Sequence, residues 1–148
     1  MPDTRSLIVE QFRQEQGADS VYILTALQPF GVSQNRCMVV ISGRCAQLVC
    51  CNSCTPRTSL GQGSLREVEP AELEQFLRDL QDADLAWTGD AIPPQVHDGI
   101  TYTVERADAH GYERVRIVDP SPDSPHARLL AAWRNAFPEA RRMMDNVR

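Results

Sequence analysis

Cys50, Cys51 and Cys54 lie close together in the chain, and closely spaced thiols can bind a metal ion or carry out redox chemistry. The Cys51-x-x-Cys54 spacing can place two thiolates on one Zn²⁺, and Cys37 or a histidine would complete the four ligands. Thiol-redox motifs of this spacing place their first cysteine at the start of a helix, whereas the residues from Thr55 to Arg57 predict a loop. Zinc-binding or thiol-redox chemistry at Cys50, Cys51 and Cys54 is therefore an alternative function for this chain.

Cys37 offers this cluster a second kind of partner. The segments 36–42 and 45–51 flank Gly43-Arg44, and glycine at the first central position of a two-residue turn favours a hairpin. The predicted register places Cys37 opposite Cys50, and a pair of the non-hydrogen-bonded kind would be close enough for a disulfide. We expect such a pair to stay reduced in a cytosol. The simplest interpretation is that the cysteines are small apolar strand residues, with Cys54 partly exposed.

The familiar catalytic motifs are missing from the sequence. No serine stands in a Gly-x-Ser-x-Gly motif, and Gly61-Gln62-Gly63 lacks the lysine that follows a phosphate-binding loop. His97 and Asp98 are neighbours, and adjacent residues on an extended chain point to opposite faces, so they do not predict a catalytic dyad. The sequence therefore favours a protein that is not an enzyme, and it calls for no cofactor.

The charged residues are distributed unevenly along the chain. The net charge is −5, yet residues 67–90 contain eight carboxylates and only one basic residue, Arg78. Such a surface attracts a basic protein partner, while the negative net charge and the lack of basic runs disfavour nucleic acid. The carboxylates predicted to bind the partner are Glu72, Asp79, Asp82, Asp84 and Asp90. The leading prediction is a non-enzymatic protein-binding module, most concretely an antitoxin-like or immunity-type inhibitor of a basic bacterial toxin.

Apolar runs are too short to predict a membrane protein. The longest, such as Met38 to Ile41, cover a small fraction of a bilayer. Near the N-terminus only three consecutive apolar residues, Leu7 to Val9, precede Glu10, so the chain has no apolar region typical of a signal peptide. We therefore expect a cytoplasmic protein without membrane contact.

The clearest structural signal is a hairpin formed by residues 100–107 and 112–118. Apolar and polar residues alternate on both sides of a turn. The best register pairs Val104 with Val115 on one face and Glu105 with Arg114 on the other, which matches both apolar and charged side chains. We expect the face of Val104 and Tyr102 to be core, and the face of Glu105 and Tyr112 to be solvent.

The other elements complete an α+β fold in a single domain over residues 1–148. Further strands are predicted at 20–27, 36–42 and 45–51, with a short one at 64–68. Helices are predicted from an Asp3 cap to Gln16, with Leu7, Ile8 and Phe12 on one side, at 70–82 and at 125–137, with an amphipathic tail after Pro138. Because hairpins dominate, we expect an antiparallel sheet of about five strands, with two or three helices packed mainly on one face.

An ordered set of motifs resembles that of a group of small bacterial α+β proteins of unknown activity. The motifs are Tyr22-x-Leu24-Thr25-Ala26-Leu27-x-x-Phe30, Pro70-Ala71-Glu72-Leu73, Asp98-Gly99-x-x-Tyr102-x-x-Glu105 and Gly111-Tyr112-x-Arg114. The resemblance covers roughly residues 20 to 137. It implies a shared architecture and no particular activity, and the cysteines at 50–54 are not part of the pattern.

Overall fold

The computed structural model describes residues 3–28, 34–55, 57–94 and 99–146. His97, Asp98 and Phe30, which the sequence analysis singled out, lie outside these residues. Six strands form one sheet in the order β4-β3-β2-β1-β5-β6, and each neighbouring pair is antiparallel. The strands are β1 Ser20–Leu27, β2 Gln34–Ser42, β3 Cys45–Cys54, β4 Ser64–Glu67, β5 Thr101–Asp108 and β6 Gly111–Ile117. The predicted α+β antiparallel fold is confirmed, with the short 64–67 segment as the sixth strand.

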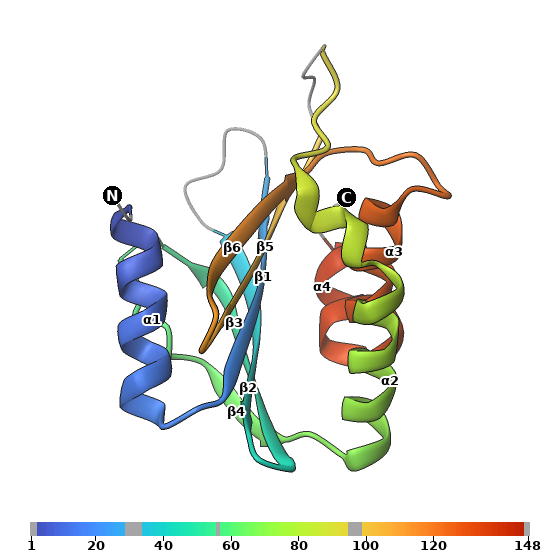
Figure 1. Cartoon of the computed structure of the whole chain (residues 1–148). Coiled ribbons are helices and arrows are strands. Elements are labelled where there is room, and N and C mark those ends of the chain that lie inside the picture. The colour runs from blue at the N-terminus through green and yellow to red at the C-terminus, as the bar shows by residue number, and fades with distance from the viewer. Residues whose placement is uncertain (1–2, 29–33, 56, 95–98, 147–148) are drawn as a thin grey trace.

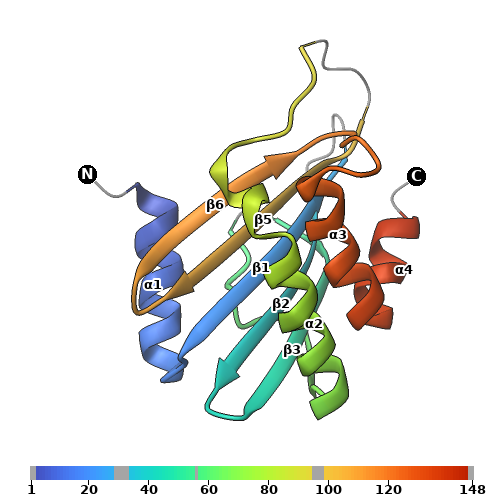
Figure 2. The ribbon, with the colours of Figure 1, turned by 45° about the vertical axis from the view of Figure 1, so that its right-hand side comes forward.

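Helices cover both faces of this sheet (Figure 1). Helix α1 Thr4–Gln16 lies alone on one face. The opposite face carries α2 Pro70–Asp82, the short 3-10 helix η1 Asp84–Thr88, α3 Pro125–Ala136 and α4 Pro138–Asn146. Figure 2 shows α2 and α3 side by side across the strands, with α4 beyond them. The predicted concentration of helices on one face is therefore observed, and α1 forms a third layer.

Local signals in the sequence explain where these helices begin and end. The carboxylate of Asp3 accepts a hydrogen bond from the Ser6 amide at 2.8 Å, and Gly17 ends α1 with a φ of 63°, which favours glycine. Ser124 caps α3 in the same way, and Pro125 follows as its first residue. The predicted helix ends near residues 3, 17, 70 and 125 are therefore confirmed.

Both predicted hairpin registers are confirmed. Strands β5 and β6 pair Tyr102 with Ile117 and Val104 with Val115, and the turn is the two residues between Asp108 and Gly111. Strands β2 and β3 pair Ser42 with Cys45 across Gly43-Arg44, and the register continues to Cys37 opposite Cys50. Gly43 has a φ of 62°, as the first central residue of a type II′ turn requires.

The larger hydrophobic core lies between the sheet and helices α2 to α4. Phe76 is fully buried at its centre, and its ring centroid lies 4.9 Å from that of Trp133 and 5.0 Å from that of Phe137. Aromatic pairs at such distances contribute beyond the area that they bury. Tyr22 from β1 contacts the same ring edge-on. This cluster joins α2, α3 and the α3–α4 junction to the sheet.

A smaller core lies between the sheet and α1, and it corrects the prediction that this face is solvent. Val9 is fully buried against residues such as Ile23 and Met38. Glu105, predicted to be exposed, is 2% exposed, and Tyr112 is only partly exposed because α1 covers both. The exposure predicted for these two residues was therefore wrong, although their register was right.

The packed side of α1 also differs from the prediction. Of the three residues predicted to share its apolar side, Phe12 packs against the smaller core, but Leu7 and Ile8 are 56% and 46% exposed. Val9 is the fully buried residue of the helix. The helix is turned so that Arg5 and Val9, one turn apart, approach the sheet, because Glu105 binds Arg5. Tyr102 is partly buried rather than largely buried, on the face that α2 to α4 cover.

Candidate functional site

The structure brings together two thiols from neighbouring strands. The Sγ atoms of Cys37 on β2 and Cys50 on β3 lie 3.1 Å apart, and both cysteines are free thiols. Their side chains point to the face that carries α4, where Met143 Sδ lies 3.9 Å from Cys37 Sγ. Cys37 is 1% exposed, whereas Cys50 is partly exposed. The predicted cross-strand pair therefore has one buried and one accessible member.

A surface pocket of about 380 Å³ opens onto this pair. Besides the two cysteines, it is lined by Asn35, Asn52, Ser64, Glu139, Arg142 and Met143. The side chains come from β2, β3, β4 and α4, so the pocket lies where the end of the sheet meets the last helix. The lining is mostly polar, and it gives dissolved molecules a route to the thiol of Cys50.

The two thiols differ in acidity. The pKa of the Cys50 thiol is lowered, first by its hydrogen bond with Cys37 and further by the nearby charges of Arg66 and Arg142. Burial and the charge of Glu139 oppose this effect. The pKa of Cys37 is raised by the same hydrogen bond and by burial. Cys50 is therefore the more acidic thiol of the pair.

The other cysteines of the predicted cluster do not join Cys50. Cys51 is the next residue on the strand, so its side chain points to the α1 face. Cys54 is 3% exposed, not partly exposed as predicted, because its Sγ lies against the carbonyl of Gln34 at 3.1 Å. Among the described residues, no three His, Cys, Asp or Glu side chains are gathered as a metal site. Cys54 instead contacts the side chain of Cys51, and Cys37 is the cysteine that faces Cys50.

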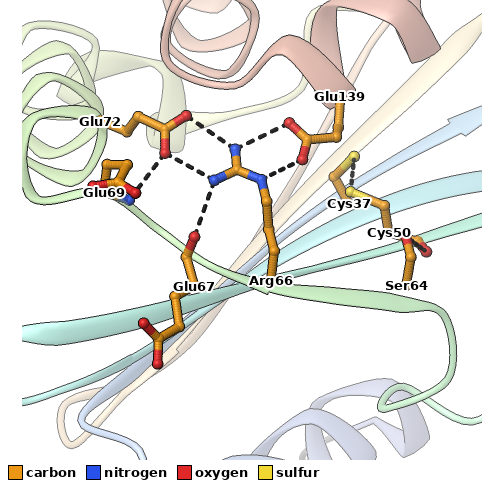
Figure 3. Close-up of polar contacts among 8 residues, drawn as sticks. All are labelled: Cys37, Cys50, Ser64, Arg66, Glu67, Glu69, Glu72 and Glu139. Carbon is orange, nitrogen blue, oxygen red and sulfur yellow. Dashed lines mark hydrogen bonds and ion pairs between the residues drawn. The ribbon is translucent and has the colours of Figure 1, made fainter.

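Arg66 on the edge strand β4 forms an ionic cluster beside the thiols (Figure 3). Its guanidinium donates to both carboxylate oxygens of Glu72 on α2 at 2.9 Å, and to both of Glu139 on α4. These hydrogen bonds from Arg66 hold the pKa of each carboxyl below its ordinary value. Glu72 also accepts from the Glu69 amide, which closes a capping box at the start of α2. Arg66 thereby ties β4 to the first turns of two helices.

The carboxylates predicted to bind a partner have two different environments. Glu72 is held by Arg66, and Asp90 is held by the amide and guanidinium of Arg116. Asp84 lies 3.6 Å from Arg106 but remains 69% exposed. Within the described part of the chain, Asp79 and Asp82 take part in no ion pair. Asp82 and Asp84 are exposed to solvent, and Asp79 is partly exposed.

Sequence reasoning missed a second polar site, which lies under the start of α1. The carboxylate of Glu105 accepts two hydrogen bonds from Arg5, at 2.7 and 2.8 Å, and one from the hydroxyl of Tyr112 at 2.5 Å. Burial and the neighbouring Glu105 raise the pKa of Tyr112. Arg36, 4% exposed, donates to the Ser59 carbonyl nearby. Nothing in the local sequence around Glu105 or Arg36 indicates these contacts, because both residues have polar neighbours in their strands.

No helix among the described residues is long and apolar enough to cross a membrane. Comparisons of the chain with models of known protein families and with curated proteins find no match.

Proposed function

We propose that the chain is a non-enzymatic protein-binding module that binds a basic partner through the outer surface of α2 and η1. Its most concrete form is an antitoxin-like or immunity-type inhibitor of a basic bacterial toxin. The observation that carries the proposal is the lack of internal ion pairs at Asp79 and Asp82 among the described residues. Carboxylates that no internal cation neutralises project a field that accelerates encounter with a cationic protein.

Exposed apolar side chains on the same two elements support the proposal. Leu85 is 68% exposed directly after Asp84, and Leu77 on α2 is 39% exposed. Apolar residues inside a charged rim are typical of binding surfaces, because charge controls encounter and register while buried apolar anchors supply most of the affinity. The outer surface of α2 and η1 offers both kinds of group to one partner.

Ion pairs within the domain reduce the number of carboxylates that we assign to partner binding. Glu72 forms an ion pair with Arg66, and Asp90 forms one with Arg116, and both pairs stabilise the domain. A partner that bound Glu72 or Asp90 directly would have to break these ion pairs. We therefore assign partner binding to Asp79, Asp82 and Asp84. Glu72 and Asp90 contribute mainly to the long-range negative field.

The test starts with the tagged chain, used to co-purify its partner from the source cell, after which both proteins are purified and recombined. We expect a dissociation constant that rises at least tenfold between 50 and 300 mM salt, because exposed charges are screened over about 10 Å at 0.1 M. The double variant Asp79→Asn/Asp82→Asn should weaken binding about tenfold at low salt and show a smaller salt dependence. Leu85→Ser should weaken binding at every salt concentration.

The matched control is Glu10→Gln/Glu15→Gln, which removes two charges from α1 on the opposite face of the sheet. Its net charge equals that of the Asp79/Asp82 variant, so a general effect of net charge would weaken both complexes equally. The proposed surface would be contradicted if both double variants weakened binding equally. It would also be contradicted if the dissociation constant changed neither with salt nor with the Asp79→Asn/Asp82→Asn substitutions.

A further inference from the structure

We infer that Cys37 and Cys50 form a reversible thiol–disulfide site, which small-molecule disulfides oxidise through Cys50. The inference is independent of the proposed partner-binding surface, which lies on α2 and η1. It rests on strand geometry, on the unequal access of the two thiols and on the pocket above them.

Strand geometry places the pair where a disulfide fits. In a hairpin closed by a two-residue turn, the flanking pair is hydrogen-bonded, and the two kinds of pair then alternate. From Ser42–Cys45 the register is regular to Cys37–Cys50, which is the fifth pair further on and therefore non-hydrogen-bonded. The Cα atoms of such pairs lie about 4.5 Å apart, within the range that disulfides span.

The sulfur atoms need to move only a short way. Their present separation is 3.1 Å, so a bond of about 2.0 Å requires a shift of about 1 Å. Rotation of the two side chains can supply most of this shift without separating β2 from β3. Met143, in contact with Cys37 Sγ, has a flexible side chain that can follow the change.

Unequal access decides which thiol reacts first. Both cysteines border the pocket that Asn52, Ser64 and Arg142 line, but Cys37 is 1% exposed under α4, whereas Cys50 is partly exposed. The reactive species in thiol–disulfide exchange is the thiolate, and Cys50 is the more acidic of the two hydrogen-bonded thiols. An incoming disulfide therefore meets Cys50, and Cys37 is positioned to resolve the product.

The reaction balances as two exchanges. The Cys50 thiolate attacks one sulfur of the small disulfide, the S–S bond of that molecule breaks, and one thiolate leaves. The resulting mixed disulfide occupies the pocket. Cys37 then loses its proton to the first leaving thiolate and attacks Cys50 Sγ. This attack releases a second small thiolate, which takes up from solvent the proton that Cys50 lost when it ionised. The two protein thiols have lost two electrons and two protons, the small disulfide has gained both, and excess small thiol reverses the steps.

The test uses the full chain, first reduced and then equilibrated with oxidised glutathione, alkylated and digested with trypsin. Cleavage after Arg36, Arg44 and Arg57 separates Cys37, in peptide 37–44, from the other four cysteines, in peptide 45–57. We expect these two peptides to be joined by a disulfide in the wild type. The joined product should disappear when reduced glutathione is added in excess.

Single cysteine variants identify which residue forms the disulfide with Cys37 and which of the two thiols reacts first. Cys50→Ser should abolish the joined product, whereas its neighbour Cys51→Ser, on the opposite face of β3, should retain it. Cys37→Ser should trap glutathione on Cys50, and Cys50→Ser should leave Cys37 without an adduct. Cys37→Ala and Cys50→Ala repeat both measurements, with circular dichroism to verify folding, in case a buried serine disturbs the core.

Three outcomes would overturn the inference. They are a joined product that persists in Cys50→Ser, a wild type that forms no joined product at saturating oxidised glutathione, and an adduct on Cys37 equal to that on Cys50. Exposed Cys45 should carry an adduct in every variant, which confirms that the reagent was active. None of these outcomes depends on partner binding, so the two proposals fail separately.

Discussion

The two faces of the sheet differ in what holds them to their helices. On the α2 to α4 side, an aromatic cluster around Phe76 fills the space between layers. On the α1 side, a smaller cluster of mostly aliphatic residues is accompanied by a partly buried ionic contact between Arg5 and Glu105. Alternation along a strand shows which residues share a face, but it does not show whether a helix covers that face. Both faces here are covered, although in the β5–β6 hairpin only the face of Val104 has the apolar residues typical of a core.

Alanine substitutions of one phenylalanine on each side of the sheet should reveal this difference with the largest change in the free energy of unfolding. Phe76 on α2 is fully buried among three aromatic rings, whereas Phe12 on α1 is partly exposed. Truncation of Phe76 to alanine should cost about 3 to 5 kcal/mol, and the same change at Phe12 should cost roughly 1 to 2 kcal/mol. Urea unfolding of both variants gives the two values. Equal costs would mean that the α1 side is as important to stability as the aromatic core.

Weakening the ionic contact between Arg5 and Glu105 should have the next largest effect on the free energy of unfolding. Glu105→Gln leaves the Arg5 guanidinium and the Tyr112 hydroxyl with a weaker acceptor, and we expect a loss of about 2 to 3 kcal/mol. Arg5 is partly exposed, so the loss should stay below that of a fully buried pair. A double-mutant cycle with Arg5→Met measures the coupling directly. A coupling energy near zero would show that α1 is held by Val9 and its neighbours alone.

Contacts near in sequence could be predicted, and distant ones could not. The facing of Cys37 and Cys50 follows from one turn and a regular register, because hairpin geometry is local. Arg5 and Glu105 are separated by 100 positions, and Arg66 and Glu139 by 73. Nothing in the local pattern of either pair specifies the packing of α1 or α4. The thiol pair of the site could therefore be predicted, whereas the Arg66 cluster and the pocket beside it depend on the tertiary fold.

The facing of the β5–β6 hairpin can be tested by comparing Tyr102 with its neighbour. Tyr102 packs partly against the larger core, so Tyr102→Ala should cost roughly 2 to 3 kcal/mol, less than for a fully buried aromatic residue. Thr103 lies on the α1 side, opposite Arg116, and Thr103→Ala should lower the stability by about 0.2 to 1 kcal/mol. Denaturant unfolding of the two variants decides the order. A larger loss of stability for Thr103→Ala than for Tyr102→Ala would mean that the α1 side of the sheet is packed more tightly than the structure shows.

Loss of the Arg66 cluster should cost less stability than the changes at Phe76, Glu105 or Tyr102, and its effect should depend on pH. Glu72 and Glu139 have pKa values lowered below their ordinary 4.5 by Arg66, so the contribution to stability is complete above about pH 4.5 and is lost as the pH falls through the folded-state values. Because these side chains are partly exposed, we expect Arg66→Met to cost about 1 to 2 kcal/mol at pH 7. At pH 2.5 wild type and variant should be closer in stability, since the protonated carboxyls no longer attract the guanidinium. Arg78→Met, which removes an exposed pair with Glu74, should cost under about 0.5 kcal/mol at either pH. Unfolding curves at both pH values test the expectation, and a cost at Arg66 that stays constant with pH would mean that its side chain stabilises β4 by packing on α2 and α4 rather than by charge.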